Sequence, residues 1–240
     1  MSTTLNLNQE RSNSLYIVLC VLFSTVLVLS NVTLKVFYFP WFPNLPLTTG
    51  ILTYPITFLI TDLVSEIWGS RKAKFMIFLA FAMNIIMIIF TQSTLLLPSH
   101  SSWVAPNNPF GYSSVKEYQN AFLSVFSING MIFVGSMVAY LIAQLLDIKL
   151  FCFIKKKSKG RHLWLRNNVS TCLSQLLDTF IMNGIVLAWG LGLNISTCAS
   201  IMFSEYLYKV IFALLDTPFI YLFVFLIKRR FKNYDYLKAT

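Results

Sequence analysis

Six long apolar stretches constrain this chain more than any other feature of its sequence. A helix needs about 20 mainly apolar residues to cross the hydrocarbon core of a bilayer, and each stretch is long enough. The runs are continuous and do not alternate with a period of two, so they indicate membrane helices and not the strands of a barrel. The predicted fold is all-α, a polytopic membrane protein with six transmembrane helices at approximately 15–36, 48–67, 74–97, 121–149, 169–193 and 203–227.

The composition supports a membrane protein and excludes several other classes. Hydrophobic residues make up 56% of the chain and charged residues only 12%, whereas about a quarter of the residues of a soluble domain are charged. A disordered chain, a disulfide-stapled secreted scaffold and an ordinary soluble enzyme are therefore excluded. The first apolar run has one preceding Arg and no small-residue cleavage site, so we expect it to be a membrane helix and not a cleaved signal peptide. The four cysteines lie in or beside apolar runs without a CxxC pair, which indicates buried thiols and no metal site.

The positions of the basic residues predict the orientation of the chain. The net charge is +10, and cytoplasmic connections of membrane proteins carry an excess of Lys and Arg. With the N-terminus in the cytoplasm, the inner segments hold most of the cations and the outer segments hold only Lys35 and Lys116. The predicted topology is N-in/C-in, and it leaves no soluble basic face for nucleic acid. The inner cations are Arg11, Arg71, Lys72, Lys74, Lys155, Lys156, Lys157, Lys159, Arg161, Arg166, Lys228, Arg229, Arg230, Lys232 and Lys238.

The predicted organisation is one membrane domain with short tails. Residues 1–14 are expected to form a cytoplasmic N-terminal tail, residues 15–227 the six-helix domain, and residues 228–240 a basic cytoplasmic tail. The connection 98–120 is rich in Pro, Ser, Asn and Gly and is expected to be a loop without a core of its own. Its aromatic residues indicate an interfacial belt, with a lid over a site as the alternative; they are Trp103, Phe110 and Tyr112.

Ionisable side chains lie where lipid is expected. A carboxylate at the centre of a bilayer costs about 2.5–3.5 kcal/mol on insertion scales. We therefore expect these groups to face the interior of the bundle and to pair with one another, with an amide, with Lys209 or with a ligand. Six of the nine acids are involved: Asp62, Glu66, Asp147, Asp178, Glu205 and Asp216.

The second and fifth stretches each carry acids on one helix face. Asp62 and Glu66 are four residues apart and share a face. Glu66 lies near the inner end, where pairing with Arg71 or Lys72 is the alternative to a role in a site. Gln175 and Asp178 also share a face, with Asn183 nearby, and Asp178 is close to mid-membrane by residue count.

The fourth and sixth stretches each carry a polar stripe. In the fourth, the stripe ends at Asp147, for which neutralisation of Lys149 or of the lysines at 155–157 is the alternative. In the sixth, Glu205 precedes Lys209 by four residues, the favourable order for an ion pair, and Pro218 predicts a kink. The stripes comprise Tyr140, Gln144 and Asp147, and Glu205, Lys209, Phe212 and Asp216; Gly135, Ala139 and Ala143 indicate close helix packing.

The chain lacks the motifs of membrane hydrolases and ATP-driven pumps. There is no HExxH, GxSxG or Walker A sequence, and the two histidines lie in different predicted loops. The sequence therefore favours a transporter over an enzyme, without cofactor or metal. The site is expected to be near mid-membrane, with substrate reaching it by alternating access.

Several ordered blocks resemble the bacterial queuosine precursor transporter family, which is grouped with vitamin uptake transporters. Each block is short, but together they span residues 50 to 221. In the family, an Arg often occurs early in the fourth helix, and Met131 stands at that place here. The blocks are YPITFLITDLVSEIWG (54–69), GSMVAY (135–140), QLLD (144–147), WLRNN (164–168), SQLLDT (174–179), Tyr208-Lys209 and Pro218.

The resemblance implies a six-helix importer in the bacterial inner membrane. Its substrates would be 7-deazaguanine bases for tRNA queuosine modification, namely 7-cyano- or 7-aminomethyl-7-deazaguanine or queuine. The partners implied are a purine-like base and the lipid bilayer, with a homodimer left open.

The chemistry of such a base assigns roles to the buried polar residues. A carboxylate accepts both donors of the base edge, and Asp178 is the first candidate, followed by Asp62 and Asp216. Gln175 and Lys209 would tune or neutralise the site. The remaining candidates are Gln175, Asn183 or Gln144 for the carbonyl edge, Tyr54, Tyr140 or Phe212 for stacking, and Glu66 beside Asp62.

Three other functions remain open from the sequence. The chain would serve as the substrate-binding component of an ATP-driven vitamin uptake system, as a membrane enzyme acting on lipid or nucleoside, or as a passive scaffold. An acid in the middle helix of each half, Asp62 and Asp178, is compatible with an inverted repeat. The coupling ion is not indicated by the sequence.

Overall fold

The fold was examined in a computed structural model that describes residues 2–33, 36–39, 42–48, 50–104, 111–112, 114–127, 130–185 and 194–231. In these ranges the chain forms seven α-helices, one short 3₁₀ helix and a two-stranded sheet. The elements are α1 (Ser2–Val32), β1 (Val36–Phe39), β2 (Phe42–Thr48), α2 (Gly50–Ile67), α3 (Ser70–Leu95), η1 (Ser101–Trp103), α4 (Val115–Phe126), α5 (Gly130–Lys157), α6 (Leu163–Asn183) and α7 (Ile195–Arg230).

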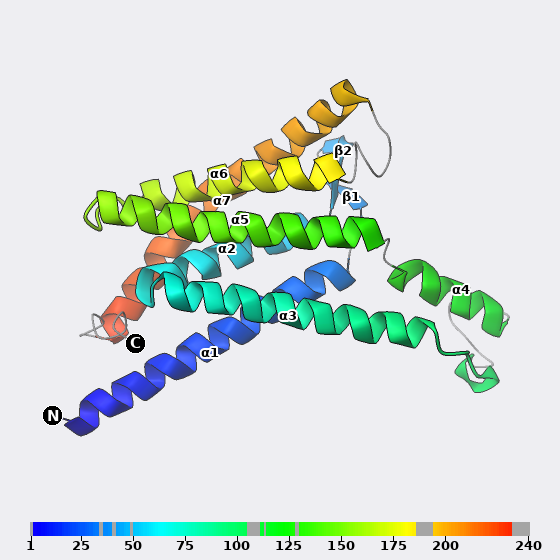
Figure 1. Ribbon diagram of the computed structural model, residues 1–240, viewed down its shortest axis with the longest axis horizontal. Coiled ribbons are helices and arrows are strands. Elements are labelled where there is room, and N and C mark those ends of the chain that lie inside the picture. The colour runs from blue at the N-terminus through cyan, green and yellow to red at the C-terminus, as the bar shows by residue number, and fades with distance from the viewer. Residues whose placement is uncertain are drawn as a thin grey trace.

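Helices α1, α2, α3, α5, α6 and α7 run between two ends of the molecule (Figure 1). The start of α1, the α2–α3 and α5–α6 connections and the end of α7 gather at one end, whereas the strands, η1 and α4 lie toward the other. Most of the basic residues in the described ranges belong to the first end, which we call the basic end; it carries Arg71, Lys72, Lys74, Lys155–Lys157, Lys159, Arg161 and Lys228–Arg230.

Helix α2 occupies the centre of the bundle. It packs against α1, α3, α5 and α7, and α6 packs against α5 and α7. From Ile60 to Trp68 every side chain of this segment is buried. The apolar core lies around it and includes Phe23 of α1, Met76 and Ile77 of α3, and Phe151 of α5.

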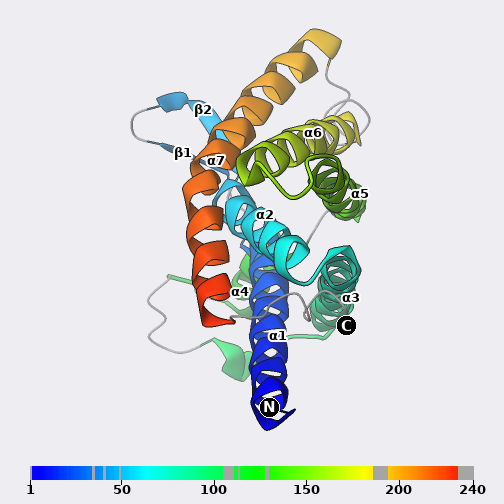
Figure 2. The same cartoon turned by 90° about the vertical axis from the view of Figure 1, so that its left-hand side faces the viewer.

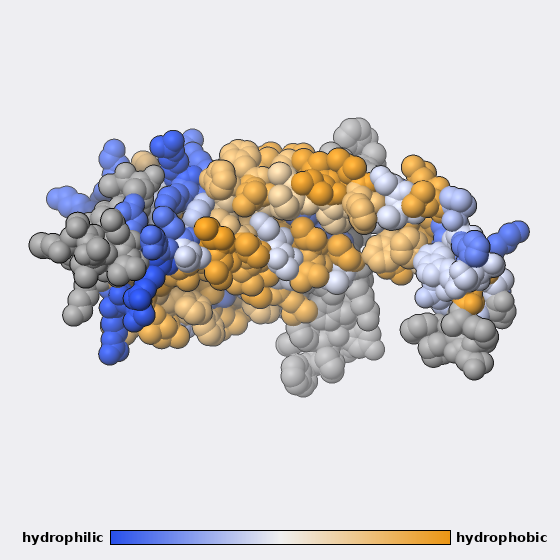
Figure 3. All heavy atoms as spheres, turned by 90° about the horizontal axis from the view of Figure 1, so that it is seen from below, coloured by the Kyte–Doolittle hydropathy of each residue, from blue (hydrophilic) through white to orange (hydrophobic). Residues whose placement is uncertain are grey.

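Helix α6 has the reverse of the amphipathic pattern of a soluble helix. Its polar face is buried, whereas apolar side chains such as Leu173, Leu176 and Phe180 are exposed. Polar membrane residues face the bundle interior because contact with hydrocarbon is costly. The exposed surface is accordingly apolar in the middle of the molecule and hydrophilic mainly at the ends (Figure 3). The buried polar residues of α6 are Arg166, Asn167, Asn168, Ser170, Thr171, Ser174, Gln175, Asp178, Thr179 and Asn183.

Four of the helices in the described ranges are long and apolar enough to cross a membrane by length and composition. They are Gln9–Val32, Ser70–Leu95, Gly135–Lys157 and Cys198–Arg230. Helices α2 and α6 are not among these four, and α6 carries the buried polar face. The helical fold is confirmed, whereas the number of six membrane spans and the N-in/C-in orientation remain predictions.

The structure corrects several of the predicted boundaries. The fourth stretch, predicted at 121–149, is divided between α4 and the longer α5. A β-hairpin, with Val36 opposite Thr48, lies between the first two long helices and was not expected. The fifth helix begins at Leu163, six residues before its predicted start.

Helix α7 contains Pro218 and changes direction along its length (Figure 2), as expected where proline removes a backbone hydrogen bond.

The connection after α3 has packing of its own, contrary to the prediction of a loop without a core. Ring centroids of Trp103 lie 4.9 Å from Tyr118 and 5.4 Å from Phe122, both on α4. Tyr112 also packs on Tyr118, at 5.4 Å. The aromatic residues described here therefore contact α4, and Phe110 lies outside the described residues.

The packing of α5 against the end of α6 can be tested at Gly135. A Cβ atom at this position would lie 2.9 Å from Cγ2 of Ile185, a stiff β-branched side chain. Gly135→Leu is expected to destabilise the fold by about 1–3 kcal/mol through overpacking, measured as a lower melting temperature in detergent. Gly184→Leu is the matched control, because no atom lies within 4 Å of a Cβ there. Equal melting temperatures for the two variants would contradict the close contact.

Candidate functional site

A cavity lies between α2, α6 and α7. The empty space around it, part of which is open to the surface, is about 290 Å³, and the centre of a water molecule can occupy about 20 Å³ of it. The cavity therefore has room for at least one water molecule. Its lining combines aromatic, amide and charged side chains: Tyr54, Pro55, Phe58, Thr171, Gln175, Lys209, Phe212, Ala213 and Asp216.

Lys209 is held at the wall of this cavity by acids from two helices. Its ammonium nitrogen lies 2.7 Å from Oδ2 of Asp178 on α6 and 3.0 Å from Oε1 of Glu205, one turn away on α7. It also donates to Oγ1 of Thr179 at 3.1 Å. Asn183 donates to Oε2 of Glu205 at 2.8 Å, which fixes the second carboxylate. The expected pairing of Lys209 within the bundle is present, and one cation serves two carboxylates.

Gln175 is the buried polar residue of the cavity that lacks protein partners. The residue is 3% exposed, and neither its side-chain oxygen nor its nitrogen has a hydrogen-bond partner among the residues that the structure describes. An unmade hydrogen bond in the interior costs about 1–3 kcal/mol for each group. A donor and an acceptor directed at a cavity wall suit a ligand that offers the complementary pair.

Aromatic rings surround this amide. Tyr54 lies beside Lys209, with 5.2 Å from the ammonium nitrogen to the ring centroid. Phe58 and Phe212 line the same cavity from α2 and α7. Planar rings around a donor–acceptor pair can bind a flat heterocycle by stacking and edge recognition.

A narrower cavity continues from the first toward the basic end. Phe58, Thr171, Ala213 and Asp216 line both cavities. The narrower one also contacts Asp62 of α2 and Asn167 of α6. The structure therefore brings Gln175, Lys209, Asp216 and Asp62 along one connected wall.

Tyr140 and Gln144 form a layer behind this wall. Gln144 donates from Nε2 to the Tyr140 hydroxyl at 3.0 Å, and the Tyr140 ring lies 6.3 Å from that of Tyr54. Neither residue lines the two cavities. In this structure, Tyr140 and Gln144 therefore support the ring of Tyr54 from behind the cavity wall.

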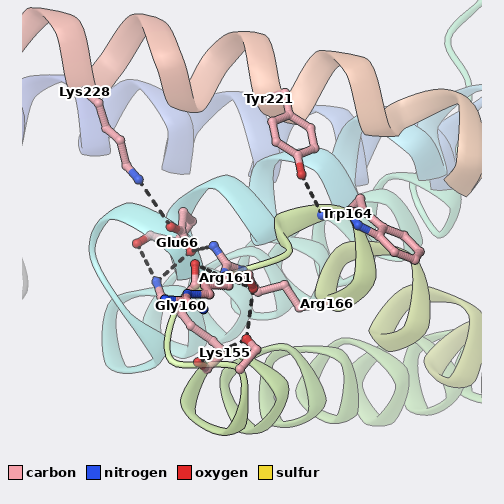
Figure 4. Close-up of polar contacts among 9 residues, drawn as sticks. Glu66, Lys155, Gly160, Arg161, Trp164, Arg166, Tyr221 and Lys228 are labelled. Carbon is pink, nitrogen blue, oxygen red and sulfur yellow. Dashed lines mark hydrogen bonds and ion pairs between the residues drawn. The ribbon is translucent and has the colours of Figure 1, made fainter.

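Glu66 belongs to a separate ion-pair cluster at the basic end (Figure 4). Its carboxylate lies 2.7 Å from Lys155 of α5, 2.7 Å from Arg166 of α6 and 3.7 Å from Lys228 of α7. The predicted pairing with Arg71 or Lys72 is therefore wrong. We call Glu66, Lys155, Arg166 and Lys228 the Glu66 cluster; it ties together four helices.

Arg166 is the cation of this cluster that sequence reasoning misplaced. It was counted in a cytoplasmic connection, but it is buried in the first turn of α6. Its Nη1 also donates to the carbonyl of Gly160 at 3.0 Å, and its guanidinium lies 5.4 Å from the Phe151 ring centroid. The repeated polar spacing from Arg166 through Ser170 and Ser174 would have indicated that the polar face starts here.

The surroundings of Asp147 also differ from the expectation. The predicted alternative was neutralisation by Lys149 or the lysines at 155–157, but none of the ion pairs among described residues includes Asp147. Its carboxyl group instead lies within hydrogen-bonding reach of Asp62 on α2. Ser174 donates to its Oδ1 at 3.2 Å.

The energetic role of the Lys209 pair can be tested by stability measurements. Lys209→Met leaves Asp178 buried without its cation, and breaking a buried pair in this way costs about 3–5 kcal/mol. The double variant Lys209→Met/Asp178→Asn removes both charges, while Glu205 keeps its bond from Asn183. We expect a large fall in melting temperature for the single variant and recovery of most of it in the double. A double variant as unstable as the single one would argue against charge burial as the cause.

Comparison with known proteins places this arrangement in a family. A family model described as a putative vitamin uptake transporter matches residues 48–223. A probable queuosine precursor transporter from Bacillus subtilis (strain 168) is 29% identical over 180 residues, which cover 74% of this chain and 72% of the relative. A second protein of that name, from Haemophilus influenzae, is 28% identical over 138 residues, or 58% of this chain and 51% of the relative. No solved structure matches the chain significantly.

The matched region contains every helix that lines the cavity. Residues 48–223 run from the start of α2 through most of α7. The resemblance found in the sequence blocks is thereby confirmed at the level of the family. The chain belongs to the putative vitamin uptake transporter family, together with proteins named as probable queuosine precursor transporters.

Proposed function

We propose that this protein imports a purine-like 7-deazaguanine base, a precursor of queuosine, across the bacterial plasma membrane. The names of the two relatives support the class of cargo, and the buried polar face of α6 supports a path through the bundle. Substrate would enter the cavity between α2, α6 and α7 and leave it on the other side by alternating access.

The unpaired amide of Gln175 is the observation that carries the proposal. Its donor and acceptor match the neighbouring acceptor and donor on the edge of a guanine-like base, as amides do in base recognition. Tyr54, Phe58 and Phe212 supply apolar rings around it. Recognition of a flat base would thus combine stacking with one bidentate contact.

The acids have different roles in this proposal. Asp216 lines the cavity and is the acid placed to accept the donor edge of the base. Asp178, the first candidate from the sequence, would act through Lys209, which it holds at 2.7 Å. Asn183 would position Glu205 beside the same lysine. The base would therefore meet a carboxylate and an ammonium group on the same helix, α7.

The Glu66 cluster is proposed to close the cytoplasmic side. Glu66 lies one turn from Asp62 toward the basic end and joins α2 to α5, α6 and α7. Opening on this side would require these ion pairs to separate. The small volume that the centre of a water molecule can occupy, about 20 Å³, supports a cavity that must widen before a base is admitted.

The proposal can be tested through queuosine in tRNA. A bacterium unable to make queuosine precursors would express this chain and receive 7-cyano-7-deazaguanine, 7-aminomethyl-7-deazaguanine or queuine. Wild type is expected to restore queuosine with at least one base. Gln175→Leu removes a contact worth about 1–3 kcal/mol, so it should raise the base concentration needed for half-restoration by roughly tenfold or more.

Gln92→Leu on α3 is the matched control, because the same substitution is made far from the cavity lining. Both variants must reach the membrane in equal amounts. Failure of every base to restore queuosine, with working downstream enzymes, would overturn the proposed cargo. Equal behaviour of Gln175→Leu and Gln92→Leu would overturn the proposed base contact.

The proposed N-in/C-in orientation can be tested with single cysteines. In a background in which the four native cysteines are replaced by Ala, Lys159→Cys marks the α5–α6 connection and Lys116→Cys marks α4. The positive-inside rule predicts that a membrane-impermeant maleimide labels position 116 in intact cells and position 159 only after permeabilisation. The opposite labelling pattern would reverse the proposed orientation.

A further inference from the structure

Two buried carboxyl groups at the centre of the bundle face one another. Asp62 on α2 is 2% exposed and Asp147 on α5 is fully buried. Their side chains lie within hydrogen-bonding reach of each other. One oxygen of each, Oδ1 of Asp62 and Oδ2 of Asp147, finds no donor in the described part of the chain. Two ionised carboxylates in contact repel one another, whereas one proton between them forms a hydrogen bond.

The nearby cations are engaged elsewhere. Among described residues, Lys155, Arg166 and Lys228 pair with Glu66, and Lys209 pairs with Asp178 and Glu205. No ion pair in the same ranges includes Asp62 or Asp147. The negative charge of the pair is therefore not balanced by a basic side chain of the described residues, and a bound proton would reduce it.

Hydroxyl groups of α6 distinguish the two acids. Ser174 donates to Asp147 at 3.2 Å, and the hydroxyl groups of Ser170 and Thr171 also lie near that carboxyl group. Donors stabilise the ionised form of a carboxyl group. The arrangement favours a proton on Asp62, which then donates to Asp147.

The other titratable groups around the pair carry no compensating charge. Cys152 of α5 and Asp216 of α7 also interact electrostatically with Asp62, and neither side chain can carry a positive charge. On α3 the basic residues occupy the first turn at the basic end, where Lys72 lies 5.3 Å from the Tyr16 ring centroid of α1. On α1, the charged residues whose side chains are described are Glu10 and Arg11, and both are exposed near the start of the helix.

We propose that Asp62 and Asp147 form a proton-binding site that couples import of the base to inward movement of a proton. This inference rests on the proposed function. A proton from the outer solution binds to Asp62 and is shared with Asp147 as O–H···O; after the site turns inward, the proton returns to water on the cytoplasmic side. Only the proton changes its binding partner, and each carboxyl group ends the cycle as it began.

The cavities connect the proton site to the base site. Asp62 lines the narrower cavity together with Phe58, Thr171 and Asp216, and these three residues also line the wider one. Thr171 additionally reaches Asp147. Movement of α6 or α7 around a bound base therefore changes the surroundings of both acids, which is the physical link that coupling requires.

The contact between the acids favours a proton over a metal cation. An ion between them would need several oxygen ligands around it, whereas these carboxyl groups already lie within reach of one another. The described residues also contain no group of three or more His, Cys, Asp or Glu side chains that could hold a metal. The experiment must distinguish coupling to a proton from coupling to a sodium ion.

The test uses the full-length protein in liposomes with 7-cyano-7-deazaguanine as the probe. Two assays are compared, namely accumulation driven by a pH gradient with the acidic side outside, and counterflow exchange without any gradient. The membrane potential is held at zero with potassium and valinomycin. A gradient of one pH unit can drive accumulation of about tenfold for one proton per base. A pH-sensitive dye inside the liposomes measures the accompanying proton entry.

Asp62→Asn and Asp147→Asn each replace one of the two carboxyl groups by an amide, so that no proton can be shared between two carboxyl groups. We expect both variants to lose gradient-driven accumulation and base-dependent proton entry, and Asp147→Asn, whose residue lines neither cavity, to retain counterflow. Glu10→Gln, an exposed acid on α1, is the control and should accumulate base as wild type does. If one variant does not fold, the other tests the same pair from the opposite helix, and proton entry with wild type tests coupling independently.

The two levels of inference fail in different ways. Absence of counterflow for wild type with any of the three bases would overturn the proposed function. Counterflow without a response to the pH gradient, or accumulation driven by sodium instead, would overturn proton coupling while leaving the proposed function intact. Undiminished gradient-driven accumulation by both variants would overturn the assignment to Asp62 and Asp147.

Discussion

The cost of placing polar groups against lipid governs this structure. Helix α6 carries its polar residues on one face, and that face must be covered by protein because hydrocarbon offers no hydrogen-bond partners. Helices α5 and α7 pack directly on α6, and Arg166 reaches across to Glu66 of α2. The same requirement places Leu173 and Phe180 on the outside. The interior is therefore polar because the surroundings are apolar.

Covering the polar face of α6 does not give every polar group on it a hydrogen-bond or ion-pair partner. Ser174 finds Asp147 and Asp178 finds Lys209, but the amide of Gln175 has no partner. In a protein selected only for stability, such a group would be replaced or paired, since its burial is unfavourable. An amide kept at a cavity wall is the feature that connects the folding of α6 to the binding of a ligand.

The charges along the bundle are distributed unevenly. At the basic end, Glu66 meets three cations from three other helices, which binds this end firmly. Farther along, Lys209 serves two acids. Between these groups, Asp62, Asp147 and Asp216 have no ion pair within the described ranges. A transporter needs such a difference, because groups without fixed partners can exchange a ligand or a proton while ion pairs hold the closed side.

Local patterns in the sequence were sufficient to predict the long helices but insufficient to predict which residues contact one another between helices. Hydropathy identified the long helices, but it joined α4 to the fourth stretch because apolar residues continue on both sides of Ser127. The β-hairpin before α2 was missed because its short strands lack a regular alternation of apolar and polar residues. The alternative considered for Asp147 was neutralisation by lysines close in sequence, whereas its carboxyl group interacts with Asp62 from a helix more than eighty residues away.

The sequence by itself determined the helical class, the family and several of the buried acids, because hydropathy, motif order and the cost of charge in lipid are local properties of the chain. The sharing of a face by Gln175 and Asp178 also follows from helix geometry alone. Only the tertiary structure decided which acid meets which cation, and which polar atoms remain unpaired beside a cavity. These outcomes depend on the packing of helices distant in sequence, and residue spacing within one helix carries no information about the side chains of the next.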